Sequence, residues 1–126
     1  MRLDISCVRS VLLEFEEFPF GVYTPCDFRT SIAAYGLAGV EYTLAKLAEA
    51  GYINAKLYLS REGTPEFNGI FDITFSGHQF LETIRDGKVW QKTKNVADSI
   101  GSRSFDVITK IAGNVLSGLI SAKLGL

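Results

Sequence analysis

The chain has 126 residues and a formal net charge of −1, and 47% of its residues are apolar against 21% that are charged. This balance is typical of one globular domain and is too apolar for a disordered segment. The longest uncharged run near the end, residues 111–122, is far shorter than the roughly 20 residues that a bilayer requires, so no membrane span is predicted.

The first predicted helix begins at Ile5 and ends before Pro19, since the residue before a proline avoids the helical region. Its apolar side recurs at steps of three and four, through Ile5, Val8, Leu12 and Phe15. Asp4 is a suitable N-cap, because its carboxylate can accept a hydrogen bond from a backbone N–H of the first turn. The segment that follows, 18–25, is predicted to be a turn-rich connection.

Two short helices are predicted next, over residues 27–35 and 40–50, with a tight corner at 36–39 between them. The second helix turns three apolar side chains inward at helical spacing, and these are Val40, Leu44 and Leu47. Gly51 follows this helix directly, where a left-handed C-cap residue is expected. Two short helices joined by a glycine-containing turn form the helix-turn-helix unit.

A β-hairpin is predicted after these helices, because apolar and polar residues alternate along two segments. The first arm holds Leu57 and Leu59, the second arm holds Phe71, Ile73 and Phe75, and residues 61–69 connect the two arms. Three helices followed by a hairpin are the order of elements in a winged helix.

The rest of the chain is predicted to be helical. Residues 76–79 match a capping box, from which a helix continues to about Arg85 and can resume through Val89 and Trp90. Residues 98–104 are predicted to be a loop, and a last helix runs over about 105–123. The expected fold class is therefore mainly α with a small β-hairpin, as a winged helix-turn-helix domain over 1–76 with a C-terminal helical extension over 77–126.

Three stretches of the sequence carry a resemblance to a known family. They are Met1–Asp4 with Val8-Arg9 and Leu12-Leu13, then Tyr42 with Leu44, Leu47 and Glu49–Ile53, and most specifically Ile73–Leu81 running into Ile84–Asp86 and Val89–Lys94. Together they resemble domain-of-unknown-function family 2513, an uncharacterised family of bacteria and phages. The resemblance implies a winged-helix-like fold, often in a phage or mobile-element setting, and it implies no known chemistry.

The distribution of charge bears on whether a winged helix would bind DNA. Residues 39–76 carry three basic and five acidic side chains, whereas residues 77–126 carry seven basic and four acidic. DNA affinity depends on lysine and arginine side chains that neutralise phosphates. The candidate nucleic-acid contacts are Lys46, Lys56, Arg61, Arg85, Lys88, Lys92 and Lys94. Trp90, among the last four, is either a stacking residue or part of the core.

Two functional hypotheses follow. In the leading one, the chain is a small non-enzymatic regulatory or accessory protein of phage or mobile-element type whose winged helix contacts nucleic acid. In the alternative, it is a protein-interaction module that does not bind DNA, such as an adaptor or an inhibitor of a host complex, for example of a defence system. The acidic second helix, with Glu41 and Tyr42, would then be the contact surface. The sequence alone leaves both open.

The C-terminal helix is predicted to form a homodimer contact. Its apolar stripe is wide, and Gly113, Ser117, Gly118 and Ser121 add small residues that permit close approach of another helix. The expected partner-facing residues are Ile108, Ile111, Val115 and Leu119. The other interpretation is that this helix folds back onto its own domain.

The remaining candidates for chemistry are one histidine and two cysteines. His78 is predicted to hold the hairpin-to-helix junction together by hydrogen bonds, with proton transfer or ligation as the alternative. Cys7 is predicted to be a core thiol and Cys26 to lie in a loop. Catalytic residues, metal ligands, cofactors and a membrane partner are not expected, and cysteine usage favours a reduced, cytoplasmic setting.

Overall fold

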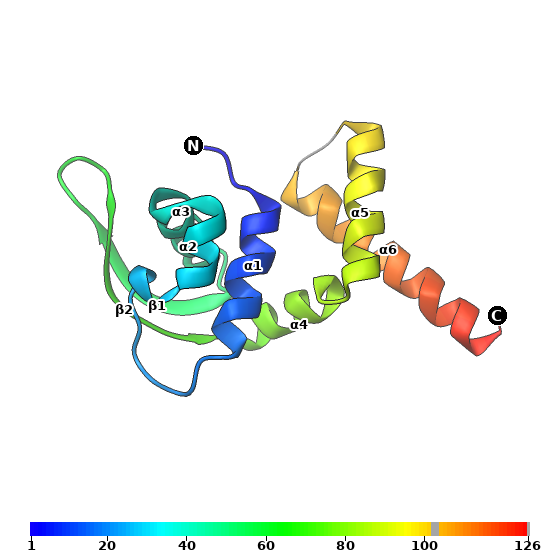
Figure 1. Ribbon diagram of the computed structural model, residues 1–126, viewed down its shortest axis with the longest axis horizontal. Helices are drawn as coiled ribbons and strands as arrows, with labels where there is room; N and C mark the ends of the chain where they lie inside the picture. The colour runs from blue at the N-terminus through cyan, green and yellow to red at the C-terminus, as the bar shows by residue number, and fades with distance from the viewer. Residues whose placement is uncertain (102–103, 126) are drawn as a thin grey trace. The chain divides into compact units, whose positions relative to one another are not determined.

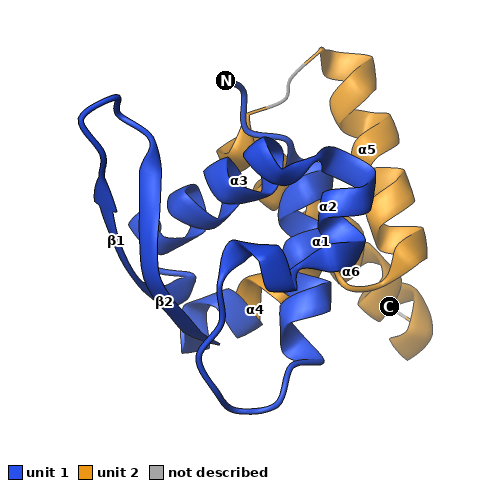
Figure 2. Cartoon of the chain, turned by 60° about the vertical axis from the view of Figure 1, so that its left-hand side comes forward, with its two compact units in different colours: residues 1–78 blue, residues 79–126 orange. Residues whose placement is uncertain are grey.

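The computed structural model describes residues 1–101 and 104–125, which form two compact units. Met1–His78 make the N-terminal unit and Gln79–Leu126 the C-terminal unit (Figure 2). The elements in chain order are α1 (Ile5–Glu16), the 3-10 turn η1 (Pro25–Asp27), α2 (Arg29–Tyr35), α3 (Leu37–Glu49), β1 (Ile53–Leu59), β2 (Pro65–Ile73), α4 (Phe75–Ile84), α5 (Gly87–Ile100) and α6 (Phe105–Leu124) (Figure 1). The fold is mainly helical with a small antiparallel hairpin, which confirms the predicted class.

Helix α1 supplies one wall of the N-terminal core. Asp4 caps it as predicted, since its Oδ1 accepts a hydrogen bond from the Ser6 backbone N at 2.9 Å. The buried face of α1 consists of Cys7, Val8, Val11, Leu12 and Phe15. This face meets α2 and α3, whose buried members include Val40 and Leu44.

Helix α2 has its N-terminus held by a side chain from α1. Its own N-cap residue, Phe28, cannot accept a hydrogen bond through its ring. The carboxylate of Glu14 accepts hydrogen bonds instead from the backbone N atoms of Thr30 and Ser31, both at 2.9 Å. A negative charge is favourable at the start of a helix, where N–H groups lack intrahelical partners, so this contact ties α1 to α2.

The corner between α2 and α3 is tighter than predicted. Only Gly36 separates the two helices, and Gly39, expected in the corner, lies inside α3. Gly36 has a φ of +80°, a value that residues with a Cβ adopt at a cost, and this lets the chain turn within one residue. The preceding helix also begins later than predicted, at Arg29, because residues 25–27 form η1.

The hairpin is longer and its loop shorter than predicted. Strands β1 and β2 pair from Ile53 opposite Ile73 to Leu59 opposite Pro65, so residues 65–69 belong to β2 and not to the loop. Gly69 lies where the register shifts, with a φ of +121°, and so accommodates an irregularity inside the strand. Ile70 also exchanges backbone hydrogen bonds with Tyr23, at 2.8 and 2.9 Å.

Thr74 joins the end of β2 to the start of α4. Its backbone N donates to Tyr52 O at 3.0 Å and its hydroxyl donates to Gly51 O at 2.6 Å, while the same hydroxyl accepts from Gly77 N at 3.1 Å. Thr74 is therefore the helix cap, and the capping box predicted at 76–79 is wrong. Phe75, predicted as an inward residue of the second arm, is the first residue of α4 and is 78% exposed.

In the C-terminal unit, α5 packs along α6. Asp86 caps α5, because its Oδ1 accepts from Lys88 N at 2.8 Å and from Val89 N at 3.0 Å. The helix extends to Ile100 and ends at left-handed Gly101, so the loop predicted at 98–104 begins too early; its residues 102–103 lie outside the described residues. The buried side chains of the two helices are Val89, Trp90, Thr93 and Ala97 on α5 and Ile108 and Ala112 on α6.

We expect Gly77→Ala to destabilise the N-terminal unit by about 1–3 kcal/mol. A Cβ at this position would collide with the Tyr52 carbonyl oxygen and would lie 2.7 Å from Ile73 Cγ2. Urea unfolding followed by circular dichroism measures the loss. Gly39→Ala is the matched control, because its Cβ would meet Tyr35 Cβ at an ordinary 3.8 Å. Equal stability of the two variants would contradict the close approach of the Tyr52 carbonyl oxygen to Gly77.

Candidate functional site

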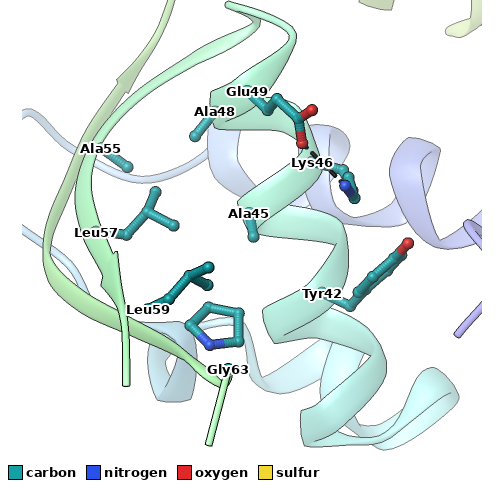
Figure 3. Close-up of a pocket in the computed structure, with 10 residues that line it drawn as sticks. Tyr42, Ala45, Lys46, Ala48, Glu49, Ala55, Leu57, Leu59 and Gly63 are labelled. Carbon is teal, nitrogen blue, oxygen red and sulfur yellow. Dashed lines mark hydrogen bonds and ion pairs between the residues drawn. The ribbon is translucent and has the colours of Figure 1, made fainter. Parts of the chain in front are cut away.

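A groove of about 520 Å³ opens between α3 and the hairpin (Figure 3). It is lined by Tyr42, Ala45, Lys46, Ala48 and Glu49 of α3, by Ala55, Leu57 and Leu59 of β1, and by Gly63 and Pro65. All of these residues belong to the N-terminal unit. The groove occupies the place where a winged helix has its recognition helix beside its wing.

The groove exists because the facing residues of α3 are small. Ala45 and Ala48 point from α3 toward the hairpin, and their side chains end at Cβ (Figure 3). Opposite them lie Leu57 and Leu59, which share one face of β1 because alternate residues of a strand point the same way. The alanines do not reach across to cover these side chains, and Leu59 remains 68% exposed. The floor of the groove is therefore apolar.

One rim of the groove is polar, and the positive charge of Lys46 on this rim is paired with the carboxylate of Glu49. Lys46 Nζ lies 2.9 Å from Glu49 Oε2 and 5.6 Å from the centre of the Tyr42 ring. The hydrogen bond to Glu49 and the charge of that carboxylate raise the pKa of Lys46. Lys46 is thus a cation with its counter-ion already in place, which weakens it as a phosphate contact.

The other predicted nucleic-acid contacts of this unit do not gather around the groove. Lys56 lies on β1 between Ala55 and Leu57, so alternation places it on the opposite face, and Arg61 lies in the exposed hairpin loop. The whole N-terminal unit carries six basic and ten acidic side chains, whereas the C-terminal unit carries seven basic and four acidic. The surface that would face DNA in a winged helix therefore belongs to an acidic unit.

The basic residues of the C-terminal unit are arranged more favourably. Lys88 and Lys92 are exposed and lie one helical turn apart on α5, while Lys94 is half-buried. Arg85 is engaged by Glu82, with Nη2 2.9 Å from Oε1. Trp90 is only 7% exposed, so it is a core residue and does not provide a stacking platform.

The predicted partner-facing residues divide into two groups. Glu41 and Tyr42 are half-exposed on α3, and Tyr42 lines the groove. On α6, Leu119 is 43% exposed and Ile111 and Val115 are half-buried. Ile108, in contrast, is 3% exposed and packs within its own unit, so it does not present a surface to a partner.

The histidine and the cysteines form no common site. His78 is exposed, and it contributes to the hairpin-to-helix junction through its backbone N, which donates to Thr74 O at 2.9 Å; the side-chain role expected of it belongs to Thr74. Cys7 is a buried core thiol as predicted, 3.2 Å from the Thr43 hydroxyl, and Cys26 is exposed. Among the described residues, no group of three or more His, Cys, Asp and Glu residues could hold a metal ion.

Helix α6 is long and apolar enough to cross a bilayer, by length and composition alone. An 18-residue stretch of its 20 residues has a mean hydropathy of 1.2. The uncharged run 111–122, from which no span was predicted, is shorter than the helix, which begins at Phe105 and includes Lys110. Only 17% of that 18-residue stretch is buried, so most of α6 is exposed or half-buried.

Sequence reasoning found Tyr42 and Lys46 but missed the groove that they border. The sequence did contain a sign of the groove. Ala45 and Ala48 stand three residues apart on the predicted second helix, and Leu57 and Leu59 stand at alternate positions of the predicted strand. The folded structure is needed to show that these two pairs of residues face one another.

Comparisons with known proteins give the chain a family but no activity. The family model described as "Hypothetical protein (DUF2513)" matches residues 2–103. An uncharacterized protein of Haemophilus influenzae strain Rd is 27% identical over 127 residues, which cover 96% of this chain and 100% of that protein. No solved structure gives a significant match.

The two thiols should differ in reactivity. Burial raises the pKa of the Cys7 thiol, so less of the nucleophilic thiolate is present at pH 8, and its side chain is also shielded from reagents. We expect Ellman's reagent to titrate Cys26 alone in the native protein and both thiols in guanidinium chloride. Cys26→Ser should abolish the native reaction. Rapid native labelling of that variant would contradict the buried position of Cys7.

Proposed function

The chain belongs to the DUF2513 family of hypothetical proteins, and from that premise we propose that it is a small non-enzymatic protein-interaction module. A segment of a partner protein would bind in the groove between α3 and the hairpin. The observation that carries this proposal is the apolar lining of that groove, with Ala45 and Ala48 opposite Leu57 and Leu59. This is the second of the two hypotheses that the sequence left open.

The size and lining of the groove suit apolar side chains. Its volume of about 520 Å³ falls in the range of small-ligand sites, roughly 300–1,000 Å³, in which apolar walls dominate and a few polar groups orient the ligand. Tyr42 and the Lys46–Glu49 pair are the polar groups at the rim. An exposed leucine such as Leu59 would gain stability when a partner side chain covers it.

Charge specifies the partner segment further. Residues 37–73, which form α3 and the hairpin, carry three basic and five acidic side chains, and one of the basic ones, Lys46, is paired with Glu49. Complementary potentials steer association and exclude wrong partners. We therefore expect a segment with two or three apolar side chains flanked by lysine or arginine. An adaptor or an inhibitor of a host complex would need a contact of this kind.

The test is a library of random 12-residue peptides displayed on phage and selected on the immobilised full chain. We expect recovered peptides to share apolar residues next to basic ones and to lose most of their affinity, about tenfold or more, for Leu59→Lys. That substitution places a cation in the groove wall, where it repels a basic peptide and removes apolar contact. Isothermal titration calorimetry with a synthetic selected peptide measures the affinity.

Tyr58→Lys is the matched control. Tyr58 is the preceding residue of β1 and is 63% exposed against 68% for Leu59, but it does not line the groove. The same new side chain therefore stands on the other face of the same strand. Equal loss of affinity in both variants, or selection of acidic peptides, would argue against the groove as the binding site.

A second candidate function rests on the exposed face of α5. Lys88 and Lys92 share that face with Asn95 and Ser99, and the charge of the C-terminal unit is +3. Lysines one turn apart on a polar helix face can contact successive phosphates without reading bases. This supports non-specific nucleic-acid contact through α5. The leading hypothesis from the sequence placed the contact on the winged helix and already included Lys88 and Lys92 among the candidate residues.

We expect Lys88→Ala with Lys92→Ala to weaken binding to random duplex DNA and to reduce its salt dependence, if α5 contacts phosphates. Fluorescence anisotropy at low and at moderate salt measures both quantities. Lys56→Ala with Arg61→Ala is the matched control, since it also removes two cations, from the hairpin. Absence of binding at low salt, or equal effects of the two double variants, would exclude α5 as the contact.

A further inference from the structure

The apolar surface of α6 is covered over only its first half. Ile108 and Ala112 are 3% and 0% exposed, because α5 packs along this part of the helix. The second half carries Ile120 and Leu124, which are 51% and 67% exposed, and Leu119, 43% exposed, which continues the side that meets α5. Large apolar side chains exposed together on one helix are typical of an interaction surface.

The two most exposed of these side chains, Ile120 and Leu124, lie on a second face of α6, beside the face that meets α5. With roughly 100° of rotation per residue, Ile108 and Ala112 point one way, and the second face is turned by roughly a quarter of a circle. Thr109, Gly113 and Leu116 lie on the same face and are half-buried. Phe105 lies at its start, but the Phe105 ring packs against Phe80, with the ring centroids 5.0 Å apart. Beyond Phe105, the small residues Thr109 and Gly113 come first along this face, and the large ones follow.

We propose that this face binds the same face of a second copy of the chain, with the two α6 helices antiparallel. The sequence of the face complements itself in that direction. If the helices cross between residues 114 and 115, Leu116 of one copy lies over Gly113 of the other. By the same reading, Ile120 meets Thr109, so each of these two large side chains faces a smaller residue.

Gly113 has the space that this arrangement requires. Apart from its two chain neighbours and the backbone of its own helix, no described atom lies within 4 Å of the place where its Cβ would be. Glycine is less favourable than alanine inside a helix, and within one chain this open position gives it no packing role. A leucine from a second helix would occupy that space, and the crossing point next to it would allow the backbones to approach closely.

The helix dipoles favour the antiparallel direction. In an antiparallel pair, the positive N-terminal end of each α6 helix lies beside the negative C-terminal end of the other. In a parallel pair, ends of the same sign would lie side by side.

A second copy fits α6 better than a lipid bilayer does. Spanning a bilayer would place Asp106, Lys110 and Asn114 in hydrocarbon, and it would separate α6 from α5, whose outer face is polar. A helix lying on a membrane surface needs a cationic stripe on its polar side, whereas Lys110 and Lys123 point in different directions. We therefore propose a second copy as the partner of this face, and the experiments below include a test for binding to lipid vesicles.

The first experiment is sedimentation velocity of the full chain over a range of concentrations. We expect a monomer–dimer equilibrium, and we expect Ile120→Glu to raise its dissociation constant about tenfold or more, because a carboxylate would be buried in the apolar contact. Asn114→Glu is the matched control, since Asn114 is exposed on the polar side of the same helix. Circular dichroism verifies that both variants keep the fold.

The second experiment tests the direction by disulfide cross-linking in a Cys26→Ser background. Thr109→Cys and Ile120→Cys chains, mixed and mildly oxidised, should form mainly the mixed dimer, because the antiparallel register brings residue 109 beside residue 120. A parallel pair would instead cross-link each variant with itself. A dimer that cross-links in this parallel way would overturn the proposed register.

Three further results would overturn the proposal as a whole. They are a monomer at all concentrations, equal effects of Ile120→Glu and Asn114→Glu, and a monomer that binds vesicles of phosphatidylcholine and phosphatidylglycerol through Ile120. The last result would assign the face to lipid. None of these measurements involves the groove of the N-terminal unit, so the dimer and the proposed function can fail separately.

Discussion

The junction around Thr74 determines how α3 and the hairpin face each other, and the groove depends on it. Thr74 donates hydrogen bonds to the carbonyl groups of Gly51 and Tyr52, which lie between α3 and β1, and its hydroxyl also caps α4. Gly77 has no Cβ, so the Tyr52 carbonyl can come close to the first turn of α4. Thr74 thus holds the open end of the hairpin, where Ile53 pairs with Ile73, beside the end of α3. Farther along the hairpin, the small side chains of Ala45 and Ala48 on α3 leave β1 partly uncovered, which forms the groove.

The junction lies within residues 73–81, on which the family resemblance mainly rests. A threonine that donates, accepts and caps at once has few substitutes, and a glycine under a carbonyl oxygen has none that leaves the backbone in place. His78 contributes its backbone N–H to the junction. In this chain the structural demands of the stretch therefore fall on Thr74 and Gly77.

The sequence predicted element types well and their boundaries less well, for a physical reason. Helical periodicity and glycine placement are local, so α1, the end of α3 and the span of α6 were found. The cap of α4 was missed because the Thr74 hydroxyl bonds a carbonyl 23 residues earlier, and the strand character of 65–69 was missed because Gly69 bulges within a paired strand. The groove was missed for the same reason, because its two walls come from segments that lie side by side only after the hairpin has folded along α3.

The two units differ in charge and in the kind of surface that they expose, and this suggests how they act together. The acidic unit has an apolar groove with room for only a few side chains, so a ligand bound there would have modest affinity. The C-terminal unit has the α6 face that we propose binds a second copy. A dimer formed there would present two grooves, and a partner with two apolar, basic segments would gain avidity of roughly 10²–10⁴-fold wherever its linker spans them. Self-association would thereby turn a weak groove into a selective one, because partners with a single segment would gain nothing.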